Sequence, residues 1–485
     1  MTEKCHYKFR RRINTGFIPV LISILVFSQA AFICLQPLLF ADDFDSFSDL
    51  DGEKTPSYSL KGFIEFENFI STGTDQDPED IYRKREVRNR VSWRYGSDSV
   101  FFILNADMYH NLFQDNDTGY SYSDEFRVQR DLSISSVSDE IAIRECYFNY
   151  QFNNVRVRAG NQIFAWGTAD VFNATAYFNP LDMREFIMRD DDELRRAIPA
   201  ISSMIFFGDD SMEIVISPVH VPIFFPPGGN FWAIEYREGP FPVRLLDPEE
   251  KDISVMNTGA AVQYYTNMRG LDINVNLFHG PDSEPLLRPL RSVAVPNEPV
   301  RVAVAPEYYI VNRLGMALSK SIDKFVFQAE CSWSPDRTGV VDQEFSSTTE
   351  LPFKTAKSHS VSYSAGANWF VPLDSWISGH RGETVLTLEW YQSFYTDPRI
   401  MEPLISEILS ISLQDTFWND RIDLSFKGLI DTSNRSFALI PEGGFRFRSG
   451  ICVSASWLHI KSSKGSFLGY FRGKDIATVG VRYEY

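Results

Sequence analysis

The sequence predicts an all-β protein, a transmembrane antiparallel up-and-down β-barrel of about 14 to 18 strands with long proline-rich loops. Three observations predict this fold: a basic and then uncharged leader, about a dozen segments that alternate apolar and polar residues, and a last strand that ends on the aromatic Tyr485. The chain has 485 residues, of which 44% are hydrophobic and 14% aromatic, too apolar a composition for a disordered protein.

The leader has the pattern of a secretory signal peptide. Basic residues between Lys4 and Arg12 precede an uncharged stretch, and acidic sequence begins at Asp42. We therefore expect residues 1–41 to be a signal peptide cleaved after Ala41, followed by an acidic flexible segment over residues 42–57 and the barrel over residues 58–485. An uncleaved membrane anchor is the alternative, because the apolar stretch is long for a signal peptide.

Apolar and polar residues alternate with a period of two, which is typical of strands. In Val87–Tyr95 the residues Val87, Val91, Trp93 and Tyr95 share one face, and Arg88, Arg90 and Arg94 share the other. Comparable segments begin near residues 100, 271, 325, 361 and 422. The one later uncharged stretch of helical length, 214–234, is interrupted by prolines and glycines, so no membrane-spanning helix is expected there.

The C-terminal strand separates a membrane barrel from a soluble β-sandwich, which would alternate in the same way. Ala477, Val479, Val481, Tyr483 and Tyr485 share one face of this strand. The pattern resembles the terminal recognition strand of bacterial outer-membrane barrels. The resemblance implies a place in the cell outer membrane, contact with outer-membrane lipid, and a barrel-assembly signal in Val481, Tyr483 and Tyr485 that the assembly machinery would bind.

Three proline-rich stretches interrupt the alternation. They are Pro218–Pro248, Pro281–Pro306 and Asp397–Glu407. Proline cannot donate a hydrogen bond to a strand ladder, so these stretches are expected to be loops outside the cell or inside the bore, whereas short turns face the periplasm.

The segment from Val155 to Pro199 carries a family resemblance. It contains G-x-Q-x-x-x-W-G, then N-P-x-D, then an acidic-Leu-basic stretch that ends in Pro, at Gly160, Gln162, Trp166, Gly167, Asn179, Pro180, Asp182, Glu193, Leu194, Arg195 and Pro199. This resembles a family of porin-like outer-membrane barrels catalogued as a domain of unknown function. The resemblance implies a porin-like barrel in the outer membrane and supplies no substrate.

Without the family, the same segment gives two interpretations. Gly160–Gly167 would close a strand at an aromatic belt residue, Trp166, and Asn179–Asp182 would form a turn. The charged stretch after it would form a short helix inside or beneath the barrel. Either the whole motif is a structural turn, or the segment is a constriction lined by Asp190, Asp191, Asp192, Glu193, Arg195 and Arg196.

Arginines cluster on polar strand faces early in the chain. They are Arg88, Arg90, Arg94, Arg144, Arg156 and Arg158. Neighbouring strands would stack them into a basic wall, and an acidic loop facing that wall would set a transverse field across the bore. The alternative is a solvated rim that meets lipid phosphates. The net charge of −17 hints at cation preference, but total charge does not locate a field in the pore.

An aromatic cluster lies in the first proline-rich stretch. Its members are Phe224, Phe225, Phe231 and Trp232. Anchoring at the membrane rim is the favoured interpretation, and stacking on sugars or apolar solutes is the alternative.

Several classes of function are set aside. An acidic chain without a long basic run is not expected to bind nucleic acid. The five cysteines and seven histidines have no metal-ligand spacing, and no cofactor motif is present. Asp107 and His110 lie near one strand end without the surroundings of a catalytic pair, so an enzyme is not expected.

The leading hypothesis is a porin-like channel for passive diffusion of small solutes of unknown identity. A non-conducting surface scaffold, adhesin or envelope-assembly barrel is the first alternative. An export channel for a polymer such as an exopolysaccharide is the second. A homotrimer is left open.

Overall fold

The structure is a computed structural model. It describes residues 57–73, 82–112, 120–123, 125–185, 188–189, 191–227, 230–233, 243–248, 251–293, 301–342, 351–377, 380, 382–401, 403, 405–463 and 466–485. The expected signal peptide (residues 1–41) and all of the expected acidic segment (residues 42–57) except Ser57 lie outside the described residues, so both stay predictions. Residues Tyr58–Tyr485 form one compact unit.

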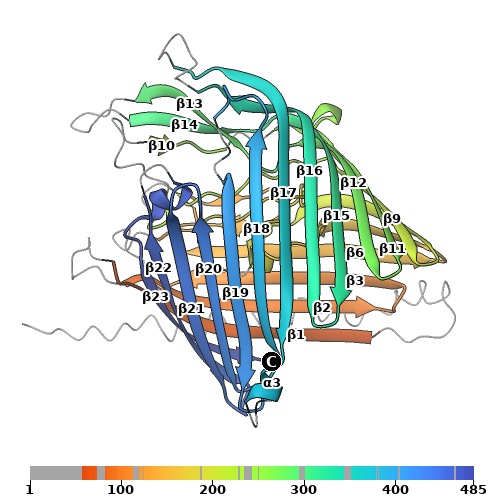
Figure 1. The fold of residues 1–485 in the computed structure, drawn as a ribbon, viewed down its shortest axis with the longest axis vertical. Helices are drawn as coiled ribbons and strands as arrows, with labels where there is room; N and C mark the ends of the chain where they lie inside the picture. The colour runs from red at the N-terminus through yellow and green to blue at the C-terminus, as the bar shows by residue number, and fades with distance from the viewer. Residues whose placement is uncertain are drawn as a thin grey trace, which may run out of the picture. The chain divides into compact units, whose positions relative to one another are not determined.

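Within the described residues, eighteen long strands form one closed antiparallel sheet (Figure 1). The strands are β1 Ser57–Ser71, β2 Tyr82–Gly96, β3 Val100–Asn111, β6 Asp139–Phe152, β7 Val155–Gln162, β8 Ile198–Phe207, β9 Asp210–Ser217, β11 Gly259–Met268, β12 Leu271–Pro281, β15 Ile310–Ile322, β16 Phe325–Val340, β17 Thr355–Val371, β18 Thr384–Tyr395, β19 Glu407–Phe417, β20 Ile422–Asp431, β21 Ser436–Arg446, β22 Ile451–Lys461 and β23 Ile476–Glu484. Of two short strands, β5 Ile134–Ser135 pairs with the first residues of β6, and β4 Arg127–Val128 pairs with β5.

The sheet closes because the last strand pairs with the first. β23 lies antiparallel to β1, with Phe66 opposite Val481 and Ile64 opposite Tyr483. The Tyr485 hydroxyl donates to the Asn89 side chain on β2 at 3.1 Å. A closed sheet has no unpaired edge, which is the condition for strands to cross a membrane. The predicted transmembrane antiparallel barrel is confirmed, and its strand number lies at the upper end of the predicted range.

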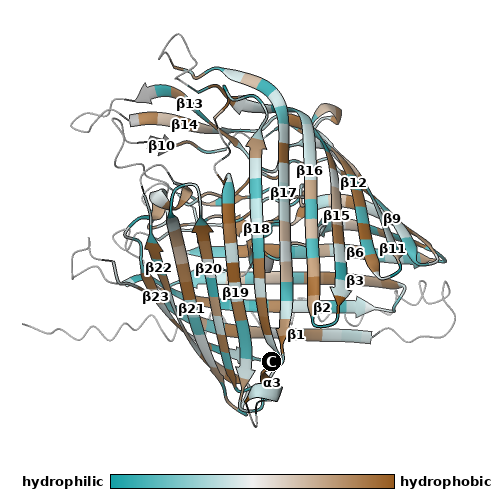
Figure 2. Cartoon of the chain, in the orientation of Figure 1, coloured by the Kyte–Doolittle hydropathy of each residue, from teal (hydrophilic) through white to brown (hydrophobic). Residues whose placement is uncertain are grey.

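The two faces of each strand have the predicted polarity (Figure 2). On β12, Leu277 is 56% exposed on the outside, whereas its neighbour Asn276 is fully buried. On β16, Trp333 faces outward and Ser332 is buried. An outer surface of exposed aliphatic and aromatic side chains has no favourable partner in water and matches a lipid environment.

The two ends of the barrel differ in the length of their connections. The end that we call the turn end holds Tyr485 and tight turns such as Arg269-Gly270, where both residues have positive φ. It also holds the short helix α3, Leu373–Trp376, in a longer connection (Figure 1). Most long connections lie at the other end, the loop end. Among the described residues, no helix is long and apolar enough to cross a membrane.

The proline-rich stretches are more ordered than expected. A separate sheet at the loop end joins β10 Val243–Leu245, β14 Arg301–Glu307 and β13 Leu286–Val293. The interpretation of Pro281–Pro306 as loop throughout is therefore wrong. The ladder between β13 and β14 shifts register between Pro289 and Arg291, so a bulge accommodates the proline that cannot donate to it. Two single-turn helices, η4 Val255–Asn257 and η6 Phe467–Phe471, lie in other loop-end connections.

Candidate functional site: a strap inside the barrel

The connection between β7 and β8 folds into the bore. We call residues 163–197 the strap; the structure describes them apart from 186, 187 and 190. It contains the short helix α2, Asp191–Leu194. The two strands that carry it pair with each other up to Gln162 and Ile198, so both ends of the strap leave the wall at the same point.

Asn179 holds the two legs of the strap together. Its side-chain oxygen accepts the Phe164 amide at 2.7 Å, and its nitrogen donates to the carbonyl oxygens of Gln162 at 3.1 Å and Arg196 at 2.7 Å. The side chain is 3% exposed. Backbone groups buried away from water need partners, and this one amide supplies three. Next to it, the Pro180 carbonyl accepts the Arg196 amide at 2.9 Å.

Two motif glycines are required by the backbone. Gly160 has φ +135° and a Cβ there would overlap the Cys146 carbonyl of β6. Gly167 has φ +98° and a Cβ there would overlap the Asn173 side chain. An L-residue has a steric cost at such φ values, so glycine is required at residue 160 within β7 and at residue 167 in the strap.

Trp166 is not an aromatic belt residue, and that expectation is wrong. It is 4% exposed, and its indole nitrogen donates to Glu213 of β9 at 3.1 Å. Its ring packs edge-on against Phe178 of the strap, with 5.3 Å between ring centroids. Trp166 therefore anchors the strap to the inner wall, which a membrane-facing side chain could not do.

The predicted arginines on β2 meet the predicted acidic residue of the strap. Arg88 donates two hydrogen bonds to Glu193, at 2.8 and 3.0 Å, and a third to Asp107 of β3 at 2.9 Å. Arg90 makes a bidentate pair with Asp107 at 2.6 and 2.7 Å and lies 3.0 Å from Glu193. Arg88 and Asp107 are almost fully buried, so these are inner contacts and not a solvated rim.

A bulge brings Arg144 into the same group. The ladder between β3 and β6 runs from Asn105 opposite Glu145 directly to Ala106 opposite Ile143 and skips Arg144. The extra residue changes the alternation of β6, and the Arg144 guanidinium donates to the Glu193 carbonyl at 3.1 Å.

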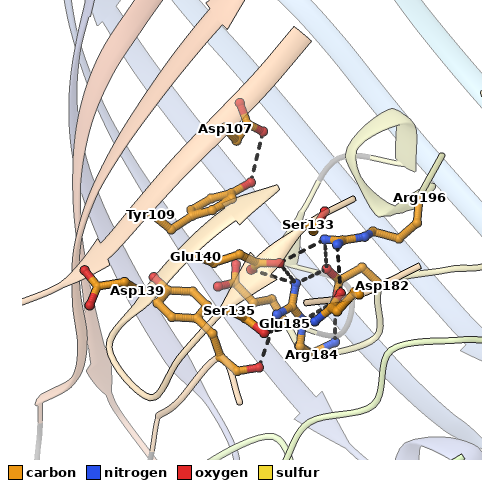
Figure 3. A network of polar contacts seen from close by, with 12 residues as sticks. Asp107, Tyr109, Ser133, Ser135, Asp139, Glu140, Asp182, Arg184, Glu185 and Arg196 are labelled. Atoms are coloured by element: carbon orange, nitrogen blue, oxygen red, sulfur yellow. Dashed lines mark hydrogen bonds and ion pairs between the residues drawn. The ribbon is translucent and has the colours of Figure 1, made fainter. Parts of the chain in front are cut away.

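The strap contributes its own cations to a second group of ion pairs (Figure 3). Arg184 lies 2.8 Å from a Glu140 oxygen and donates to Asp182 at 2.8 Å. Arg196 donates to Asp131 at 2.8 Å and to Glu140 at 3.1 Å. All these groups are buried or nearly so, and a buried charge is tolerated when it is paired and hydrogen-bonded.

These contacts lower the pKa values of the strap carboxylates. Burial alone would raise the pKa of Asp182, but Arg184 and Arg196 lower it to about 2. In the same way, burial would raise the pKa of Glu193, and Arg88 and Arg189 lower it to about 2. Both carboxylates therefore stay ionised well into the acidic range.

A third group of pairs connects the strap to the loop-end half of β2. Lys84 is fully buried and pairs with Glu86 at 2.7 Å and with Glu185 of the strap. Arg189 lies 3.1 Å from Glu86 and 2.5 Å from Glu185. The Tyr120 hydroxyl donates to Glu185 at 2.5 Å. Positive and negative side chains alternate through this group, so little net charge is left.

Two carboxylates on the opposite wall hold the middle of the strap. Glu330 of β16 accepts the amides of Thr168, Ala169 and Thr175, the last two at 2.7 and 3.2 Å. Glu389 of β18 accepts the amides of Asp170, Val171 and Phe172, at 2.7, 3.3 and 2.8 Å. β16 and β18 lie about half-way round the closed sheet from β2 and β6. The strap therefore crosses the bore and is bonded at both sides.

The remaining residues that were predicted to line the pore lie at several separate positions. Arg94 lies over the Phe101 ring, Arg156 over Phe206 and Arg158 over Tyr147, all on inner faces near the turn end. Arg195 forms an isolated bridge with Leu181. Asp191 and Asp192 begin α2, and Asp190 lies outside the described residues. The acidic loop was expected to face the basic wall across the bore. At Glu193 the two are in direct contact, because this carboxylate pairs with Arg88 and Arg90.

The aromatic cluster also lies inside the barrel, so the expected anchoring at the membrane rim is wrong for all four of its members. Trp232 is fully buried and belongs to an apolar cluster with Phe471 of η6 and inward residues of β19–β23. Arg196 lies over the Phe224 ring at 4.2 Å, and Lys474 lies 5.9 Å from the centre of the Phe231 ring. Phe225 borders a cavity in the lumen.

That cavity lies between the strap and the loop-end connections and has a volume of about 360 Å³. The strap contributes Phe172 and Met183, and the walls and connections contribute residues such as Tyr391, Met401 and Tyr470. Sequence reasoning identified Phe225 alone among these apolar lining residues, because the others come from strands and loops far apart in the chain. No group of His, Cys, Asp or Glu in the described residues is arranged to hold a metal ion.

A family model described as "Protein of unknown function (DUF1302)" matches residues 68–399. No curated protein matches the chain. Solved structures with a similar course include OccAB3 of Acinetobacter baumannii, at 11% identity and TM-score 0.48 over 88% of this chain and 99% of that one. Pseudomonas aeruginosa OccK9 has 7% identity and TM-score 0.45 over 88% and 98%. Salmonella typhi OmpF in complex with daunomycin has 8% identity and TM-score 0.41 over 88% and 97%. Likenesses at this level carry no argument about function.

Proposed function

The chain belongs to the DUF1302 family of proteins of unknown function, and from its own structure we propose that it is an outer-membrane channel for passive diffusion of small solutes. The observation that carries this proposal is the strap. It crosses the bore, it is bonded to β2, β3 and β6 on one side and to β16 and β18 on the other, and it borders an internal cavity. A segment fixed in this way narrows a lumen to a defined size.

The outer surface of the barrel supports a place in the outer membrane. Its outward side chains are apolar along the strands, and its sheet has no free edge, as a bilayer requires. Export through a signal peptide, insertion by the barrel-assembly machinery through Val481, Tyr483 and Tyr485, and assembly as a homotrimer are parts of this proposal that stay predictions. Ion preference set by Asp190, Asp191 and Asp192 is another.

Conductance tests the proposal. Purified protein in a planar bilayer is expected to give steady single-channel steps, and replacing Asp190, Asp191 and Asp192 with Asn is expected to change the cation-to-anion ratio. Folded protein is verified by heat-dependent mobility in gels. Folded barrels that insert and give no steps would contradict the channel.

One observation favours a second candidate, a surface scaffold or adhesin. The sheet of β10, β14 and β13 is separate from the barrel sheet at the loop end and pairs with none of its strands within the described residues. Such a sheet would present a surface outside the membrane. Polymer export has less support, because a strap bonded to both walls narrows the passage that a polymer needs.

A further inference from the structure

We infer that the cavity beside the strap binds solutes that have an uncharged apolar or aromatic body. This inference deepens the proposed channel and rests on it: the cavity would be the point at which a solute is selected. Ligand sites of 300–1,000 Å³ lined mainly by hydrophobic and aromatic side chains, with a few polar groups, are typical of small-molecule binding, and this cavity of about 360 Å³ has that composition.

Packing explains only part of the apolar lining, because Phe172 and Ile405 pack on one side against the buried cluster around Trp232. Phe172, Phe225 and Ile405 are half-buried, and Met401 is 46% exposed, so part of each surface faces the cavity. Exposed apolar area costs free energy in water, about 25 cal/mol per Å². A channel that passed only hydrated ions would gain nothing from this lining, whereas an apolar solute would cover it.

Four charged side chains at the border of the cavity, those of Asp282, Glu284, Glu307 and Arg337, are already in ion pairs. Asp282 pairs with Arg313 and, at 2.9 Å, with Arg337. Arg337 also lies 2.5 Å from Glu284. Glu307 accepts the Tyr309 hydroxyl at 2.5 Å and lies 3.5 Å from Arg288. A charged solute would have to compete with these pairs, so the border favours a solute without net charge.

A hydrogen-bonding group remains for the polar end of such a solute. The Tyr395 hydroxyl donates to the Thr338 carbonyl at 3.2 Å, and its oxygen keeps acceptor capacity. The volume also suits the ligand class, because an apolar protein cavity of about 150 Å³ accommodates benzene. A ring with a polar substituent therefore fits.

The test uses the full chain in lipid nanodiscs and two probes that differ by one apolar group, phenyl β-D-glucopyranoside and glucose. Calorimetry is expected to show saturable binding of the phenyl glucoside at least tenfold tighter than that of glucose, after subtraction of empty nanodiscs. Benzoate, which carries a charge, is expected to bind more weakly than the phenyl glucoside.

The variant Phe225→Ser/Met401→Ser is expected to weaken phenyl glucoside binding about tenfold. Met268→Ser is the matched control, because Met268 is 60% exposed at the turn end, far from the cavity. Equal binding of phenyl glucoside and glucose, or an unchanged affinity for phenyl glucoside in the folded double variant, would overturn the inference. Conductance steps without a preference for phenyl glucoside over glucose would overturn the binding site and leave the proposed channel intact. A preference for phenyl glucoside without conductance steps would support the binding site and contradict the channel.

Discussion

At the scale of single residues, one amide side chain and a few ion pairs hold the strap in its place. Asn179 satisfies three backbone groups from the two legs of the strap, and Glu193 receives Arg88 and Arg90 from the wall. Neither side chain belongs to a barrel strand. Their loss is therefore expected to change the lumen and to leave the wall closed.

Asn179→Ala is expected to release the legs of the strap. Each hydrogen bond contributes about 1 kcal/mol, and each buried group left without a partner costs about 1–3 kcal/mol. Single-channel conductance should rise or become noisy while heat-dependent gel mobility still reports a folded barrel. Asn179→Asp keeps the acceptor and should give an intermediate effect. Wild-type conductance in both variants would show that Asn179 does not position the strap.

Acid is expected to loosen the strap between about pH 4.5 and pH 2. The pKa values of Asp182 and Glu193 are lowered to about 2 in the folded chain, from 3.8 and 4.5. A lowered pKa contributes stability that is fully present above the unfolded value and is lost as the pH falls through the folded value. For Glu193 the contribution is about 3 kcal/mol at 1.36 kcal/mol per pKa unit.

Conductance recorded from pH 7 down to pH 2 measures this acid effect. Glu193→Gln, which cannot ionise, should show a smaller change over that range. A wild-type conductance that changes mainly between pH 7 and pH 5 would point to other groups.

At the scale of elements, two strands on the far wall, β16 and β18, hold the middle of the strap. Glu330 on β16 and Glu389 on β18 each accept three backbone amides from residues 168–175. The register of β16 with β17 and of β17 with β18 places both carboxylates on the inner face. A carboxylate that receives several N–H groups is a strong acceptor site.

The double variant Glu330→Ala/Glu389→Ala is expected to free the far side of the strap. The ladder hydrogen bonds of β16 and β18 are unchanged, so the barrel should fold. Single-channel current noise should increase, and it should increase more than in Asn368→Ala, which removes the exposed contact of Asn368 with Asp170. Equal noise in the two variants would argue against the two carboxylates as the main attachment.

Sequence reasoning could predict the elements better than their contacts. The period of two predicted the strands and the inner faces of Arg88 and Arg90, because each strand has one face to lipid. Sequence reasoning also named Arg144, but it could not predict the contact of Arg144 with the strap, because a bulge changes the alternation of β6. It also missed Glu330 and Glu389, because their partners are main-chain amides more than 150 residues away. A main-chain amide is the same in nearly every residue type, so the sequence does not reveal such a partner. Trp166 and Trp232 were misplaced because an aromatic residue suits both a membrane rim and an inner core.

At the scale of the whole molecule, the barrel reverses the usual arrangement of a globular protein. Apolar side chains cover its outside, and paired charges fill much of one inner wall. Two inner regions of the described chain depart from this rule. Ile408, Leu458 and Ile476 face inward and pack under Trp232 and η6, and Ile198, Val215 and Phe278 pack against the strap. The interior is thus charged beside β2, β3 and β6, and it is apolar where the strap packs on β8, β9 and β12 and where η6 packs on β19–β23.

The lipid-facing surface gives a test of the membrane assignment. Leu277→Arg places a charge in the middle of β12, between Val262 and Leu314. It is expected to cost about 2–4 kcal/mol at the centre of a bilayer, whereas Met268→Arg, at the strand end, should cost about 0–1 kcal/mol. Guanidinium unfolding in lipid vesicles measures both. A similar cost at the two sites would contradict a bilayer centred on Leu277.

The attachment of the strap to Glu330 and Glu389 has a consequence for evolution. Both carboxylates bind the peptide amides of residues 168–172, which every amino acid except proline possesses. Side chains at these positions can therefore be exchanged without detaching the segment. Descendants of one ancestral gene could acquire different permeant molecules by substitutions in a short stretch, while the inherited cylinder stays the same.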